Sequence, residues 1–205
     1  MVNDVIFYRH VFPSWLLAGT TLRKFGNIAQ DDGKDKLSRK IKSKINLILT
    51  LNQIHSSKII NADNINNETK IHTGDGFYTS KAKTLVVIKT ADCAPVIIVD
   101  IKSKKLLLLH AGRKGLEVGI IRKGIREMLG KGAYISNLRI LIGSFIDSCC
   151  YSYNMKNSIY LQIVESNIMK EQFFFVGECT SCKNNKYFSH RQGDYERMGT
   201  FAMIR

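Results

Sequence analysis

The chain has 205 residues, of which 44% are hydrophobic and 23% are charged, and its formal net charge is +14. This length and apolar content predict one domain with a substantial core and exclude a disordered chain. Every apolar run falls far short of the roughly 18 residues that a membrane-spanning helix needs, so we expect no membrane partner.

The beginning of the sequence lacks the pattern of a secretory signal peptide, because Asp4 comes early and the apolar run 15–18 is short. We therefore expect a cytoplasmic protein whose five cysteines are reduced. The excess of basic residues raises nucleic acids and anionic small molecules as partners. Apart from segment 34–44 these residues are scattered, so a basic nucleic-acid-binding domain is kept only as the non-enzymatic alternative.

Short apolar runs bounded by turn residues predict strands, and apolar residues at a spacing of three and four predict helices. The expected strands are residues 5–8, 54–60, 86–88, 96–99, 106–109, 138–146, 173–176 and 200–204. The expected helices are residues 36–49, which carry a solvated basic face, 116–129 and 159–169. Turns are expected at 19–26, 61–67, 74–76 and 112–115. Strands and helices mix without strict alternation, so we predict an α/β fold, a single layered domain over residues 1–205 with mixed β-sheets and helices packed outside.

Two residues at strand ends suggest chemistry. Cys93 interrupts two apolar runs within the segment Thr90–Pro95, and His110 follows four consecutive leucines. A thiolate and an imidazole on one rim of a sheet could hold a transition metal, or act as a nucleophile and its base. They could also be a buried free cysteine and an unrelated histidine. His55 adds a third possible ligand, although the spacing of the three residues alone does not establish a site.

Several sequence blocks occur in order over nearly the whole chain. They are Gln53-Ile54-His55, Gly74-Asp75, Thr90–Val96 with Asp100, His110-Ala111-Gly112 followed by Gly115-Leu116, Ile142-Gly143 with Cys149-Cys150-Tyr151, Cys179-Thr180, Tyr187–Arg191 and Gly199–Ile204. These blocks resemble the YfiH-like family, also called the laccase-domain or polyphenol oxidase family, the peptidoglycan editing factors and the bacterial purine nucleoside phosphorylases. Gly19–Gly26, with Arg23, resembles the family's front turn more weakly.

The resemblance implies a zinc site made by His55, Cys93 and His110. Three protein ligands that leave a fourth position open are typical of catalytic zinc. The implied activities are phosphorolysis of adenosine- or inosine-type nucleosides to base and ribose 1-phosphate, and deamination of adenosine. The expected partners are therefore a purine nucleoside and phosphate, with Cys93 in a catalytic as well as a metal-binding role.

The same resemblance suggests further site residues. Arg23, Lys114 and Arg191 are candidate phosphate anchors, since phosphorolysis needs cations around the attacking anion. Asp75 or Asp92 could orient a ligand histidine or move a proton.

Two other enzyme classes carry the family's names and use the same residues. One is a peptidoglycan-precursor editing amidase, and the other is a copper-dependent polyphenol oxidase. We expect copper to bind in vitro, because Cu²⁺ exceeds Zn²⁺ in intrinsic affinity. The chain departs from the family pattern at Arg113-Lys114, where Trp-Arg is usual, at Ser144, where proline is usual, and at Phe25, where glycine is usual. These departures leave the three ligands intact and change the substrate pocket.

Cys179-x-x-Cys182 invites a zinc-ribbon or redox interpretation. A zinc ribbon needs a second such pair, and the remaining thiols are the adjacent Cys149 and Cys150. Adjacent cysteines are a poor geometry for a closed site, so we expect these four residues to be plain reduced cysteines.

Overall fold

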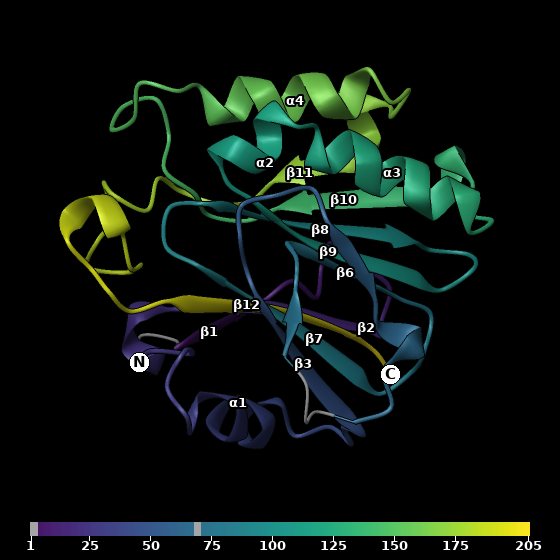
Figure 1. Cartoon of the computed structure of the whole chain (residues 1–205), viewed down its shortest axis with the longest axis horizontal. Helices are drawn as coiled ribbons and strands as arrows, with labels where there is room; N and C mark the ends of the chain where they lie inside the picture. Colours follow the sequence, from purple (N-terminus) through teal and green to yellow (C-terminus); the bar gives the residue numbers. More distant parts are fainter. Residues whose placement is uncertain (1–3, 68–70) are drawn as a thin grey trace.

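The computed structural model of the chain describes residues 4–67 and 71–205 (Figure 1). Within these residues, two six-stranded sheets lie face to face between outer layers of helices. Helix α1 covers the free face of one sheet, and helices α2, α3 and α4 cover the free face of the other (Figure 1). The predicted α/β class, with mixed sheets and helices outside, is confirmed.

The first sheet has the strand order β1-β2-β12-β7-β3-β5. Its middle strand β12 runs antiparallel to both β2 and β7, whereas β3 runs parallel to β7. The strands are β1 (Val5–Phe7), β2 (Leu16–Thr21), β3 (Leu47–Asn52), β5 (His72–Thr73), β7 (Thr84–Thr90) and β12 (Met198–Ile204).

The second sheet has the strand order β11-β10-β8-β9-β6-β4. Its centre is antiparallel, and each edge strand runs parallel to its neighbour. The strands are β4 (Ile59–Asn61), β6 (Gly76–Thr79), β8 (Ala94–Asp100), β9 (Lys105–Ala111), β10 (Leu138–Ile142) and β11 (Phe173–Phe175).

The described residues form four α-helices and several short 3₁₀ helices. The α-helices are α1 (Gly33–Ile41), α2 (Arg113–Glu117), α3 (Ile120–Gly130) and α4 (Met155–Val164). The 3₁₀ helices are Arg23–Phe25, Ala62–Asn64, Ile135–Asn137, Lys170–Gln172 and His190–Gln192. None of these helices is long and apolar enough to cross a membrane, as judged over the part of the chain that the structure describes.

The unbroken apolar runs of β8 and β9 arise because both faces of their sheet are covered. Leu106 and Leu108 point into the core between the sheets, where they join Val86 and Ile88 of β7. Leu107 and the other alternate side chains of β9 face the helices instead. This alternation is the two-residue period of a strand, and burial on both sides removes the polar positions that an exposed sheet would show.

The structure confirms the strands expected at 86–88, 96–99, 106–109, 173–176 and 200–204 and corrects three elements in the first third of the chain. The basic helix ends at Ile41 because Lys42 adopts a left-handed backbone with φ 52°, and residues 47–52 form β3. Only Ile59–Asn61 of the expected strand 54–60 is a strand, and His55 lies in the preceding loop. Part of the expected front turn belongs to β2, whose Gly19 lies directly under the ring of Phe201.

Later elements differ mainly in their boundaries. The expected helix 116–129 is two helices, separated where Gly119 has φ 74°, and Gly115 lies inside α2 rather than in a turn. Helix α4 begins at Met155 because the Asn154 side chain accepts a hydrogen bond from the backbone N–H of Asn157. It ends at Val164, and β10 ends at Ile142, each earlier than expected.

Candidate metal centre

Three connections of the chain cross from the first sheet to the second at the same end of the molecule. They join β3 to β4, β5 to β6, and β7 to β8. The first carries His55, the second carries Asp75 and the third carries Cys93. His110 lies beside them on β9, opposite Pro95 of β8. The fold therefore gathers residues that are far apart in the sequence.

The donor atoms of His55, Cys93 and His110 all lie within 4.8 Å of one another. The Cys93 Sγ is 3.8 Å from the His55 Nε2, and the two imidazole rings meet edge to face with centroids 4.8 Å apart. His110 is buried, Cys93 is half-buried and His55 is exposed. Such a cluster of one thiol and two imidazoles, open on one side, has the donor set that zinc prefers.

Asp75 holds two of these residues in place. Its carboxylate accepts hydrogen bonds from the backbone N–H groups of His55 at 2.9 Å and Ser56 at 2.6 Å, and from the Ser56 hydroxyl at 2.8 Å. It also accepts the Nδ1–H of His110 at 2.9 Å, which leaves the Nε2 of that ring as the donor for a metal. Burial alone would raise the pKa of Asp75, but His110 and Ser56 lower it to about 2.

Cys93 and His110 shift each other's ionisation in the metal-free protein. Burial alone would raise the pKa of the Cys93 thiol, but His110 and His55 lower it to about 6. Burial alone would lower the pKa of His110, but Asp75 and Cys93 raise it to about 9. At neutral pH the site therefore holds a thiolate beside an imidazolium, and a metal cation would replace that proton.

We expect alkylation of Cys93 in chelator-treated protein to follow a thiolate fraction with its midpoint near pH 6. Only the thiolate reacts, so the alkylation rate should fall as the pH drops through about 6. Peptide mapping after brief iodoacetamide pulses separates Cys93 from the other cysteines. In urea the midpoint should return to near 9, and a midpoint near 9 in the folded protein would contradict the site's electrostatics.

Gly112 lets the backbone approach the cluster closely. A Cβ at this position would lie 2.8 Å from the Cys93 Sγ and 2.9 Å from the His55 Cδ2. These distances are too short for any other residue without displacement of a ligand. The glycine of the sequence His110-Ala111-Gly112 is therefore required by space, since its φ of −82° would suit other residues.

A cavity of about 1150 Å³ opens directly over the cluster. His55, Cys93 and His110 lie in its wall, and cations predominate over the carboxylates of Asp92 and Glu117 in the rest of the lining. The cationic residues are Lys89, Arg113, Lys114, Arg191 and Arg197. A pocket with this charge favours an anionic or phosphorylated ligand.

The other residues predicted from the sequence take different places. Lys114 and Arg191 line the cavity, whereas Asp75 lies beneath the histidines. Asp92 also lines the cavity, but it binds the Thr180 hydroxyl at 2.6 Å and the backbone N–H of Arg191 at 2.8 Å. Its carboxylate thus links the segments that carry Thr180 and Arg191 at the wall of the cavity. Arg23 is not in the cavity lining, because its guanidinium pairs with Asp194 and lies 4.6 Å over the Phe188 ring.

Sequence reasoning gave no role to two aromatic residues of the lining. Tyr151 lies under the guanidinium of Arg191, with 4.8 Å between the guanidinium carbon and the ring centroid. Tyr195 also lines the cavity and is 89% exposed. The block Cys149-Cys150-Tyr151 was a signal for the first of these residues, and the sequence holds no comparable signal for the second.

The structure thus combines a two-sheet α/β fold with a cysteine–histidine cluster in the wall of a basic pocket. The family model described as "Multi-copper polyphenol oxidoreductase laccase" matches residues 31–156. The match covers more than half of the chain, so the chain belongs to this family, and the resemblance to YfiH-like proteins is confirmed.

Two of the relatives that carry the name purine nucleoside phosphorylase illustrate the similarity. The protein of Rickettsia prowazekii is 34% identical over 140 residues, which are 68% of this chain and 54% of the relative. The protein of Clostridium acetobutylicum is 33% identical over 132 residues, which are 62% of this chain and 53% of the relative. The chain thus spans about half the length of the curated relatives it matches.

Solved structures support the fold. Bacillus licheniformis hypothetical protein YfiH superposes with a TM-score of 0.90 at 19% identity, over 100% of this chain and 97% of that chain. YlmD from Geobacillus stearothermophilus superposes with a TM-score of 0.85 at 20% identity, over 94% and 93% of the two chains.

Proposed function

We propose that this chain is a zinc-dependent purine nucleoside phosphorylase that also deaminates adenosine. The single observation that supports this most strongly is the convergence of His55, Cys93 and His110 in the wall of a basic cavity. The names of the two relatives support the substrate class.

The three residues suit zinc because they offer one thiolate and two imidazole nitrogens and leave a position for a ligand. The same donors suit copper, which makes metal identity part of the proposal. A zinc ion held by these residues would supply a Lewis acid that polarises an oxygen in the pocket. Asp75 fixes the tautomer of His110, and Gly112 leaves space for the thiolate and the His55 ring.

Phosphorolysis forms a bond between a phosphate oxygen and C1′ of the ribose, while the C1′–N9 bond breaks and its electron pair stays with the purine. The attacking phosphate is an anion, so cationic side chains must neutralise part of its charge and orient it toward C1′. We propose this role for Lys114 and Arg191. Arg113 is partly engaged, since its guanidinium binds Glu117 at 2.8 Å. Deamination would place adenosine in the same pocket, where water adds to C6 and ammonia leaves.

The test is a side-by-side assay of zinc-loaded protein on adenosine with phosphate and on a muropeptide precursor, and of copper-loaded protein on a phenol. With adenosine and phosphate, we expect adenine and ribose 1-phosphate, together with inosine and ammonia from deamination. Release of an amino acid from a serine-containing muropeptide precursor, without nucleoside turnover, would favour the editing amidase. Sustained phenol oxidation by copper-loaded, zinc-free protein would favour the polyphenol oxidase.

Lys114→Ala is expected to raise the KM for phosphate by about 10- to 100-fold, because a charged hydrogen bond contributes about 1.5–3 kcal/mol. The KM for the nucleoside should change little. Lys123→Ala is the matched control, since Lys123 is an exposed lysine on α3 outside the cavity lining. Steady-state kinetics with phosphate as the varied substrate measures the effect, and equal KM values in the two variants would remove Lys114 from the phosphate site.

A further inference from the structure

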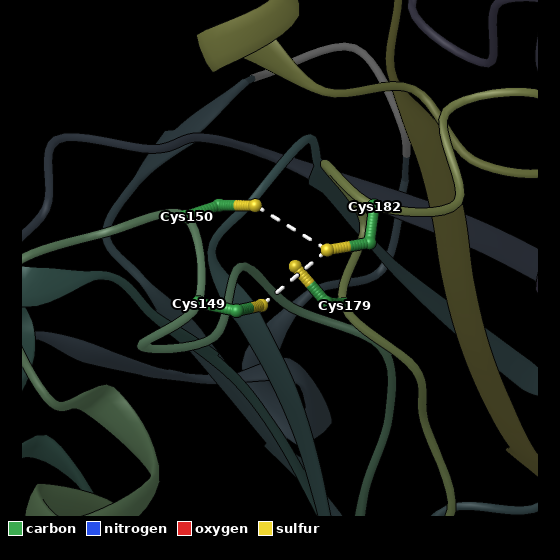
Figure 2. Close-up of side chains that lie close together, drawn as sticks. All are labelled: Cys149, Cys150, Cys179 and Cys182. Atoms are coloured by element: carbon green, nitrogen blue, oxygen red, sulfur yellow. Dashed lines mark hydrogen bonds between the residues drawn. The ribbon is translucent and has the colours of Figure 1, made fainter.

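Four cysteines from two separate loops meet outside the site described above (Figure 2). Cys149 and Cys150 lie in the loop that follows β10, and Cys179 and Cys182 lie in the loop that follows β11. All four sulfur atoms lie within 4.8 Å of one another. In Figure 2 the four side chains converge on one point from opposite sides.

The spacing of the sulfur atoms suits a single tetrahedral ion. Zinc bound to four thiolates has Zn–S distances of about 2.3 Å, which places the sulfur atoms about 3.8 Å apart. The Sγ of Cys182 lies 3.4 Å from that of Cys149 and 3.3 Å from that of Cys150. Because Cys182 is equally close to both partners, the arrangement does not single out one disulfide pair.

The backbone around the cluster supports a metal site. Residues 179–182 have the Cys-x-x-Cys spacing of a zinc knuckle, and they lie in a turn in which the Lys183 N–H donates to the Cys179 carbonyl oxygen at 3.0 Å. The backbone N–H of Asp147 donates to the Cys179 Sγ at 3.4 Å. A hydrogen bond of this kind stabilises a metal-bound thiolate.

We propose that Cys149, Cys150, Cys179 and Cys182 bind one zinc ion as a structural site, separate from His55, Cys93 and His110. Four protein thiolates complete the tetrahedron and leave no position for water or substrate. The ion would join the two loops through Cys149 and Cys182, which are exposed, and through Cys150 and Cys179, which are half-buried against the core beside the helices.

The two loops also form one wall of the cavity. The first contributes Ile146 and Tyr151, and the second leads to His190 and Arg191. Arg191 lies over the Tyr151 ring and is tied to Asp92, so a displacement of either loop would disturb this wall. This consequence for substrate binding rests on the proposed function, whereas metal binding by the four thiols does not.

The test is the zinc content of protein purified without added metal, measured for the wild type, the double variant Cys149→Ser/Cys182→Ser and Cys93→Ala. Two thiols are changed together because three remaining thiolates could still hold zinc, whereas two are too few for tight binding. The expected contents are two zinc ions per chain for the wild type and one for each variant. Ser148→Ala, which alters the exposed residue beside Cys149, should keep both ions. Equal zinc contents in the wild type and the double variant would overturn the proposal.

The two variants keep this proposal separate from the proposed function. If Cys93→Ala and the wild type each hold one zinc ion that the double variant Cys149→Ser/Cys182→Ser lacks, the thiol site is supported and the site at His55, Cys93 and His110 is contradicted. Cobalt(II) provides an independent signature, because a tetrathiolate site gives intense visible absorption that Cys93→Ala should retain and the double variant should lose.

A measurement on the unmodified protein covers the case in which the double variant does not fold. Zinc release should expose four additional thiols to Ellman's reagent besides Cys93. Two results would overturn the proposal. One is a disulfide-linked peptide that joins Cys182 to Cys149 or Cys150 in protein kept under reducing conditions. The other is that bound metal does not protect the thiols from the reagent.

Discussion

Asp75→Asn is expected to weaken zinc binding at the His55, Cys93 and His110 site by about 10- to 100-fold, the usual loss when the partner of a ligand histidine is changed. The same substitution should lower the free energy of unfolding by about 3–5 kcal/mol, because it breaks a fully buried ionic network. The carboxylate now accepts hydrogen bonds from the backbone N–H groups of residues 55 and 56. In the amide, an NH₂ group would face one of these donors and could not accept its hydrogen bond. Chelator competition and urea unfolding measure the two effects.

The stability of the wild type and that of Asp75→Asn should depend differently on pH in acid. The pKa of Asp75 is lowered from 3.8 to about 2, so its stabilisation of the fold is complete above pH 3.8 and disappears as the pH falls through about 2. The wild type should show this loss, and Asp75→Asn should not. Asp63→Asn is the control, since Asp63 also accepts several loop hydrogen bonds, from residues 79–81, far from the cluster. It should lose stability but keep zinc, and unchanged zinc affinity in Asp75→Asn would contradict the role of Asp75.

His110→Ala is expected to remove one zinc ion per chain and to abolish zinc-dependent turnover, because two ligands are too few for tight binding. It should also lower the stability of the metal-free protein by about 3 kcal/mol, since it leaves the buried Asp75 carboxylate without its cationic partner. The ring thus serves both as a ligand and as the partner of a buried carboxylate. Metal analysis and urea unfolding of chelated protein measure the two effects separately.

Cys93→Ala provides the comparison for His110→Ala. Cys93 is half-buried in a connection between the sheets, and its loss leaves the bond between Asp75 and His110 in place. This variant should therefore lose zinc with a much smaller loss of stability. If both variants retained zinc, the metal site would be contradicted. If both lost the same stability, the buried Asp75 carboxylate would not need His110 as its cationic partner.

The strands of the buried sheet could be predicted because their sequences leave no alternative. The runs 96–99 and 106–109 are too short and too uniformly apolar for an amphipathic helix, and both are covered on two sides. Strand β3 was missed because Ile45 and Ile48 continue the helical spacing of Leu37 and Ile41. Neither the spacing nor the composition shows that Lys42 takes a left-handed backbone and ends the helix.

The candidate ligands could be named from the sequence, but the partner of His110 could not. Asp75 and Asp92 both lie near turns beside the ligands, and only the arrangement of the sheets assigns Asp75 to the histidines and Asp92 to Thr180. The expectation of poor geometry at Cys149 and Cys150 was wrong because these residues lie in a turn. There the N–H groups of Cys150 and Tyr151 both donate to the Asp147 carbonyl oxygen, and adjacent side chains need not point to opposite sides as they do in a strand.

The three crossings between the sheets also set where this chain can tolerate changes of length. They span only residues 53–58, 74–75 and 91–93, so one inserted residue in any of them would shift a ligand or its partner. The turn at residues 101–104, at the opposite ends of β8 and β9, has no such restriction. Insertions and deletions should therefore be accepted at the end of the molecule away from the cluster, which is also where a tag or a fused domain can be placed.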